Sequence, residues 1–166
     1  MRWIRFGVLI LAAAITQTSL IHVLGVTRAG ITPNLYLILL VYFAVHSAAV
    51  DAILASFAIG LTADLFGYTV GPQVVAFGLI GSAIAQLRQY LVMDHVLHQM
   101  AAVFAAGLLT GLLALPLYPI KGHPVPVDPW QAILWSPLYS ALVSPILFLV
   151  ADLAMRSGRK SRFGLP

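Results

Sequence analysis

The sequence predicts an all-α, polytopic membrane protein with six transmembrane helices and no extramembrane domain. Of its 166 residues, 61% are hydrophobic and only 8% are charged, and the mean hydropathy is +0.98. Soluble domains typically contain about 25% charged and about 45–50% apolar residues. So little charge cannot cover a globule with polar surface, and lipid must therefore surround most of the chain. This composition excludes an ordinary soluble enzyme, a disordered tail and a nucleic-acid-binding module.

The first expected span is Phe6–Val26, which supplies the roughly 20 mainly apolar residues that a transmembrane helix needs. Arg2 and Arg5 precede it. The small residues Ala12–Ala14 look like the cleavage site of a signal peptide, but the apolar run continues beyond them. We therefore expect an uncleaved first helix.

The apolar stretch Ile31–Phe66 is too long for one helix and is expected to form a tight hairpin of two spans. The hairpin is expected to turn near His46–Asp51, where polar residues interrupt the apolar run. Pro33 is expected in the first turn of the leading helix, where a missing N–H costs no hydrogen bond.

Three further spans follow, namely Gly71–Leu87, Val96–Tyr118 and Ala132–Ala154, with a proline-rich loop over Pro119–Pro129. The chain is thus expected to be a single integral-membrane domain over residues 1–166. Its spans cover approximately 6–26, 31–48, 50–66, 71–87, 96–118 and 132–154, and a basic cytoplasmic tail covers 155–166.

The distribution of basic residues predicts the orientation, because the cytoplasmic flanks of spans are enriched in Lys and Arg. Six spans with an inside N-terminus leave two basic residues outside, Arg28 and Lys121. The seven on the inside are Arg2, Arg5, Arg88, Arg156, Arg159, Lys160 and Arg162. A five-span chain would place either the basic tail or the N-terminal pair outside. Both ends are therefore expected in the cytoplasm.

Asp64 is the sharpest candidate for a functional residue. An ionisable side chain inside a span costs about 2.5–3.5 kcal/mol on insertion scales, so it usually faces protein or water. Helical spacing places Gly60, Asp64 and Gly67 on one stripe, where a second backbone can approach closely. A proton or ion relay and a contact to a partner are the functional interpretations. The structural interpretation, which we prefer, is a carboxylate that hydrogen-bonds the turn Gly67–Thr69 or pairs with Arg28.

Two stripes of small residues are candidate seams for the transmembrane helix of a partner, because small side chains let helix backbones approach closely in lipid. Gly107 and Gly111 form a Gly-x-x-x-Gly pair in the fifth span. Ser136, Ser140 and Ser144 repeat every four residues in the sixth.

Other polar residues and prolines inside the spans predict local features of the bundle. Pro137 and Pro145 predict a kinked last helix. Gln17 and His22 in the first span either line a cavity or form interhelical hydrogen bonds, of which the second is more common.

No set of residues suited to catalysis or to metal binding stands out. The chain has no Cys, and no Gly-rich phosphate loop, Gly-x-Ser-x-Gly elbow or His-Glu-x-x-His motif occurs. Asp94, His95 and His98 are too few to hold zinc, which needs a fixed fourth ligand. We therefore expect no catalytic residue, no metal and no cofactor.

The residues around the first hairpin resemble the rod shape-determining protein MreD family. The resemblance is carried by the run Thr32-Pro33-Asn34-Leu35-Tyr36-Leu37-Ile38-Leu39-Leu40-Val41-Tyr42 and by Gly60, Asp64-Leu65, Gly67 and Gly71. It covers the second to fourth spans well. It extends loosely to the last span, where Trp135, Pro145 and the basic tail from Arg156 lie in similar places.

The resemblance implies a subunit of the bacterial cell-elongation machinery in the inner membrane. Members of the family associate with MreC, a single-span protein with a large periplasmic domain. Through it they serve RodA, its class B penicillin-binding protein and the MreB filaments in peptidoglycan synthesis. The positions that match the family motif are Pro33, Asn34, Gly60, Asp64, Gly67 and Gly71, which the resemblance marks as structural. The turn between the second and third spans departs from it, because His46 and Asp51 stand where relatives often have a basic residue.

Three functions remain open at the level of sequence. The first is a non-enzymatic scaffold that binds a partner's transmembrane helix in a lateral groove. The alternative is the substrate-binding subunit of a vitamin or small-molecule transporter, since the family fold is similar to the six-helix subunits of energy-coupling-factor transporters. A proton-coupled carrier that uses Asp64 is the weakest of the three.

Overall fold

The computed structural model describes residues 3–24, 33–67, 72–87, 96–117 and 131–156. These residues form six α-helices, a short π-helical segment and no strand, which confirms the all-α fold class. The elements in order are α1 (Trp3–Leu24), α2 (Leu35–His46), α3 (Ala49–Phe66), α4 (Pro72–Leu87), α5 (Val96–Ala114), η1 (Gln131–Trp135) and α7 (Ser136–Arg156). Three stretches within the described ranges, Ala49–Phe66, Val96–Ala114 and Ile133–Met155, are long and apolar enough to cross a membrane.

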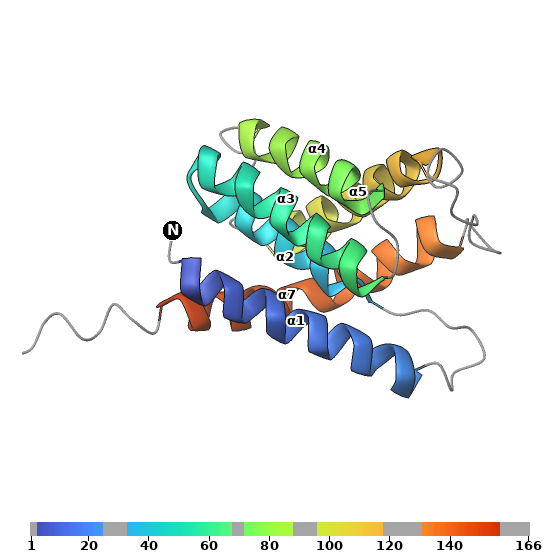
Figure 1. Cartoon of the computed structure of the whole chain (residues 1–166), viewed down its shortest axis with the longest axis horizontal. Coiled ribbons are helices and arrows are strands. Elements are labelled where there is room, and N and C mark those ends of the chain that lie inside the picture. The colour runs from blue at the N-terminus through green and yellow to red at the C-terminus, as the bar shows by residue number, and fades with distance from the viewer. Residues whose placement is uncertain (1–2, 25–32, 68–71, 88–95, 118–130, 157–166) are drawn as a thin grey trace, which may run out of the picture.

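The short helix α2 lies in the middle of the bundle and contacts α1, α3, α4, α5 and α7 (Figure 1). Ten of its twelve residues, Leu35–Ala44, are buried. Twelve helical residues rise about 18 Å, well short of the hydrocarbon core of about 30 Å. The extended backbone at the two ends of α2, at Asn34 and Ser47, is therefore expected at membrane depth. Such backbone is tolerated there only where protein surrounds it. The other helices provide those surroundings for α2.

The start of α1 and the end of α7 lie at the same end of the bundle (Figure 1). Arg5 near the start of α1 donates from Nη1 to the carbonyl oxygens of Ala154 at 3.3 Å and Met155 at 3.1 Å. A cation suits this place, because the last carbonyls of a helix lack partners within the helix. We call this end of the bundle the Arg5 end. The opposite end, where α3 finishes, is the Asp64 end.

The outward faces of the helices are apolar. Large side chains stand well exposed on several helices, for example Ile4 at 85%, Leu97 at 76%, Val50 at 71% and Ile146 at 67%. A water-facing surface rarely exposes so many large apolar side chains. The faces therefore suit contact with lipid, as expected of a membrane protein.

Two elements differ from what the sequence predicts. Pro33 precedes α2 instead of lying in its first turn, because Asn34 takes the N-cap position with extended backbone. The last helix begins with the π-helical segment η1, which gives way to α7 at Ser136, directly before Pro137. Pro137 has no backbone N–H to donate to a carbonyl of the preceding turn. A change from π-helix to α-helix beside it therefore breaks no further backbone hydrogen bond.

Candidate functional site

Asp64 caps the start of the neighbouring helix. Its side chain is fully buried, and its two oxygens accept the backbone N–H groups of Gln73 at 3.1 Å and Val74 at 2.9 Å. α4 begins at Pro72, which has no N–H, so these are the first donors that the helix presents. The carboxylate also suits the positive end of the helix dipole. The observed partners thus lie beyond the turn Gly67–Thr69 that the sequence suggested, and Arg28 and residues 68–69 lie outside the described residues.

Gly60 provides the close approach that this cap requires. A Cβ atom at Gly60 would stand 2.8 Å from both the carbonyl oxygen of Gln73 and the Cα of Val74. Those contacts are to backbone, which cannot swing aside as a side chain can. Gly67 is exposed and forms the C-cap of α3 with φ −84°, and Gly71 lies outside the described ranges. Of the glycines on the predicted stripe, Gly60 is thus the one that the structure places against α4.

The Pro-Asn start of α2 is held by side chains from two other helices. Gln17 of α1 donates to the carbonyl oxygen of Pro33 at 3.0 Å and accepts the N–H of Leu35 at 2.9 Å. Ser140 of α7 accepts the N–H of Asn34 at 2.7 Å. Asn34 itself accepts the N–H of Leu37 at 3.1 Å. Buried backbone donors without partners are costly in a membrane, and these bonds satisfy three of them where the short helix begins.

Gln17 does not belong to the family motif. The only indication of its role in the sequence is that an amide side chain occurs within an apolar span. Its two bonds to the backbone around Asn34 explain why a polar residue occurs there. The side chain of His22 lies outside the described residues.

The small-residue stripes of the last two helices are covered by this chain's own helices. A Cβ at Gly107 would stand 2.5 Å from Cβ of Pro137 and 2.7 Å from Cδ2 of Leu37. At Gly111 it would stand 3.3 Å from Cγ1 of Ile133. Ser140 and Ser144 are fully buried, and Ser136 is half-buried. Gly107 and Ser140 thus serve the packing of α5 and α7 on each other and on α2, and a role of the stripes as a seam for a partner stays a prediction.

An apolar groove opens on the side of the bundle between α1, α2 and α7. Its volume is about 160 Å³. The lining residues are Leu9, Ala12, Ala13, Thr16, Leu35, Leu39, Leu147, Val150 and Ala151. Of these, Ala12, Ala13, Thr16 and Ala151 are small, so the groove admits close approach of another backbone.

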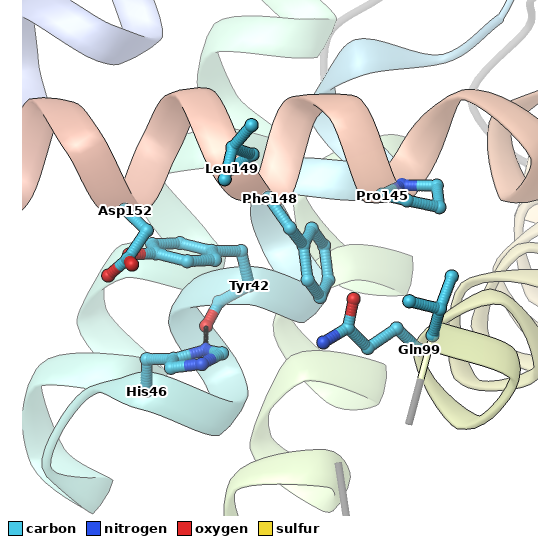
Figure 2. Close-up of a pocket in the computed structure, with 8 residues that line it drawn as sticks. Tyr42, His46, Gln99, Pro145, Phe148, Leu149 and Asp152 are labelled. Atoms are coloured by element: carbon cyan, nitrogen blue, oxygen red, sulfur yellow. Dashed lines mark hydrogen bonds between the residues drawn. The ribbon is translucent and has the colours of Figure 1, made fainter. Parts of the chain in front are cut away.

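A second cavity, of about 270 Å³, lies at the Arg5 end between α2, α5 and α7 (Figure 2). Its lining residues are Tyr42, His46, Val96, Gln99, Pro145, Phe148, Leu149 and Asp152. The rings of Tyr42 and His46 stack with centroids 4.6 Å apart, and Phe148 lies edge-on to both at 5.5 Å and 6.3 Å. His46 Nδ1 lies 3.0 Å from the carbonyl oxygen of Tyr42. This cavity therefore combines aromatic rings with a carboxylate and an amide.

Within the described ranges, no three His, Cys, Asp or Glu side chains gather in a way that could hold a metal ion. His98, one of the three residues considered for zinc, is exposed at the start of α5. Asp94 and His95 lie outside the described residues, as does the basic tail beyond Arg156.

Comparison with known proteins identifies one family. The family model described as rod shape-determining protein MreD matches residues 1–153, which is most of the chain. No curated protein and no solved structure matches the chain.

Proposed function

Since the chain belongs to the MreD family of rod shape-determining proteins, we propose that it is a non-enzymatic scaffold subunit of the bacterial cell-elongation complex. In this proposal its direct partner is the transmembrane helix of MreC. RodA with its class B penicillin-binding protein, and MreB, belong to the same assembly and carry out peptidoglycan synthesis along the rod. In this proposal the chain itself catalyses nothing. It binds MreC and thereby holds the synthases in position.

The groove between α1, α2 and α7 is the observation that carries this proposal. Helices associate in lipid through small residues, because apolar side chains gain no hydrophobic free energy from leaving lipid. Ala12 and Thr16 of α1 are exposed and lie one helical turn apart, and Ala151 of α7 lines the opposite wall. The Gly107 seam between α5 and α7 is already filled by Pro137 and Leu37. The groove is therefore the better place for a partner helix.

The orientation follows from charge. The Arg5 end of the bundle holds both ends of the described chain, joined by the bonds of Arg5 to Ala154 and Met155. Seven of the nine basic residues flank spans on the side of the chain termini. We therefore propose a bacterial inner-membrane protein whose Arg5 end faces the cytoplasm.

The alternative, a substrate-binding subunit of a vitamin transporter, needs a polar pocket open to the outside. The cavity lined by Tyr42, Gln99 and Asp152 does not serve as that pocket, because it lies at the Arg5 end, which is cytoplasmic in our orientation. At the other end, the carboxylate of Asp64 is engaged by the backbone of α4. The same engagement gives Asp64 a structural role and weakens the proton-carrier hypothesis.

The test is native mass spectrometry of the tagged protein after gentle detergent extraction from its own membranes. We expect a co-eluting single-span periplasmic protein of the MreC type. Ala12→Leu should fill the groove and reduce the fraction of complex at least severalfold. Gly7→Leu is the matched control on the same helix, since a Cβ at Gly7 would meet nothing within 4 Å.

One outcome would contradict the proposed function, and a second would contradict only the proposed binding place. A stoichiometric small molecule together with an ATPase-containing module, in place of the single-span protein, would favour the transporter subunit. Equal recovery of the complex from wild type and from Ala12→Leu would exclude the groove as the binding place while leaving the partner itself established.

A further inference from the structure

We infer that the cavity at the Arg5 end is a binding site for the headgroup of an ammonium-bearing lipid, such as phosphatidylethanolamine. This inference concerns a different site from the apolar groove and does not rest on the proposed function. It follows from the chemistry of the lining, the place where the cavity opens, and the charge that the cavity carries.

The lining matches what an ammonium group needs. Tyr42, His46 and Phe148 pack on one another with centroid distances of 4.6 to 6.3 Å and together form an aromatic wall of the cavity. Ammonium ions are attracted to ring faces and are commonly recognised by groups of aromatic side chains. The carboxylate of Asp152 supplies an opposite charge, and the amide oxygen of Gln99 can accept an N–H. Figure 2 shows these side chains coming from α2, α5 and α7.

The position of the cavity favours a lipid over a water-soluble amine. α5 and α7 pack closely where Gly107 meets Pro137, and the cavity separates the same two helices nearer the Arg5 end. Val96 and Leu149, one from each helix, line it and are 54% and 62% exposed. A molecule in the cavity therefore has apolar side chains beside it and polar groups within. This suits an amphipathic ligand whose acyl chains lie along the outer surface of α5 and α7.

The charge of the lining favours a headgroup that carries an ammonium group over one that has only the negative phosphate. Among the described residues the lining includes one carboxylate, that of Asp152, and neither Lys nor Arg. Sites for anionic lipids are instead built from clusters of basic residues. Phosphatidylglycerol, whose headgroup has no ammonium, is therefore the natural comparison.

The experiment is a lipid competition on the full-length protein, purified in detergent and stripped of lipid. Phosphatidylethanolamine, phosphatidylcholine and phosphatidylglycerol with identical acyl chains are added in turn, and retained lipid is counted by native mass spectrometry. We expect phosphatidylethanolamine to be retained over phosphatidylglycerol. Phosphatidylcholine, whose quaternary ammonium has charge but no N–H to donate, should be retained to an intermediate extent. Asp152→Asn should reduce that preference about tenfold, since a charge-assisted hydrogen bond to the headgroup is lost. Asp51→Asn is the matched control, because Asp51 is also half-buried at the Arg5 end but does not line the cavity.

Gln99→Leu is the second variant and decides the question if Asp152→Asn does not fold, as judged by its unfolding midpoint in detergent. It removes the amide acceptor, so it should also weaken retention of phosphatidylethanolamine. Equal retention of all three lipids by the wild type would overturn the inference. So would a preference for ammonium lipids that survives in both variants.

Discussion

Asp64 on α3 and Val74 on α4 are joined by a hydrogen bond of 2.9 Å from the backbone N–H of Val74 to the buried carboxylate. Gln73 donates to the other oxygen of the same carboxylate. One side chain thus caps the helix that follows its own and joins α3 to the start of α4. A polar residue inside a span, usually read as a sign of transport, here completes the backbone hydrogen bonding of the bundle.

The first prediction concerns the acceptors of this cap. Asp64→Ala should lower the free energy of unfolding by about 1–3 kcal/mol, because it leaves two buried N–H groups without this acceptor. Asp64→Asn should fall between Ala and wild type, since an amide offers one acceptor oxygen where the carboxylate offers two. Thermal unfolding in detergent, followed by size-exclusion chromatography, gives the order. An Asp64→Ala variant as stable as the wild type would show that the cap contributes nothing.

The second prediction compares two glycines. Gly60→Ala should destabilise the fold by about 1–3 kcal/mol, because the new methyl group would press on the backbone of α4 at 2.8 Å. Gly7→Ala should be neutral or stabilising by up to about 1 kcal/mol, since Ala favours a helix and open space surrounds that position. The same unfolding assay measures both. Similar effects at the two positions would mean that helix propensity alone, and not close packing, sets the result.

Hydropathy predicted the fold class because the number and length of apolar runs are properties of the chain alone. The resemblance of the first hairpin predicted the family, which the match over residues 1–153 confirms. Asp64 was recognisable as exceptional for a similar reason, as a carboxylate within such a run. Its partners were not, because the donors of Gln73 and Val74 belong to the next helix and depend on how α3 and α4 cross.

Contacts between helices that are distant in the chain could not be predicted from the sequence. The spacing of Gly107 and Gly111 indicated a seam but not which helix fills it, and in the structure residues such as Pro137 do. The cavity that brings Tyr42 to Asp152 depends on the register of α2 against α7, which periodicity within one helix does not determine. The sequence also did not show where α2 begins. The apolar run starts before Asn34, whereas the helix starts only after Asn34, which is its N-cap.

The third prediction concerns the support of α2. Ser140→Ala should lower the free energy of unfolding by about 1–3 kcal/mol, because the N–H of Asn34 loses the hydroxyl that accepts it at 2.7 Å. Ser82→Ala is the matched control, since that hydroxyl donates to the carbonyl oxygen of Gly78 on its own helix. Such back-bonding contributes little to helix stability. If both variants unfold at the same midpoint, the contact between α7 and the start of α2 is not a stabilising one.

The last prediction tests the orientation with the two ends of α3. The natural sequence has no Cys, so single cysteines can be introduced without removing others. Ala48→Cys lies in the connection between α2 and α3, and Gly67→Cys lies at the far end of α3; both positions are exposed. If the Arg5 end faces the cytoplasm, a membrane-impermeant maleimide added to spheroplasts should label the Gly67→Cys variant. The Ala48→Cys variant should react only after the membrane is opened, because its thiol then lies on the inner side. Labelling both variants in detergent controls for thiol reactivity, and the reverse pattern in spheroplasts would place the Arg5 end outside and contradict the charge argument.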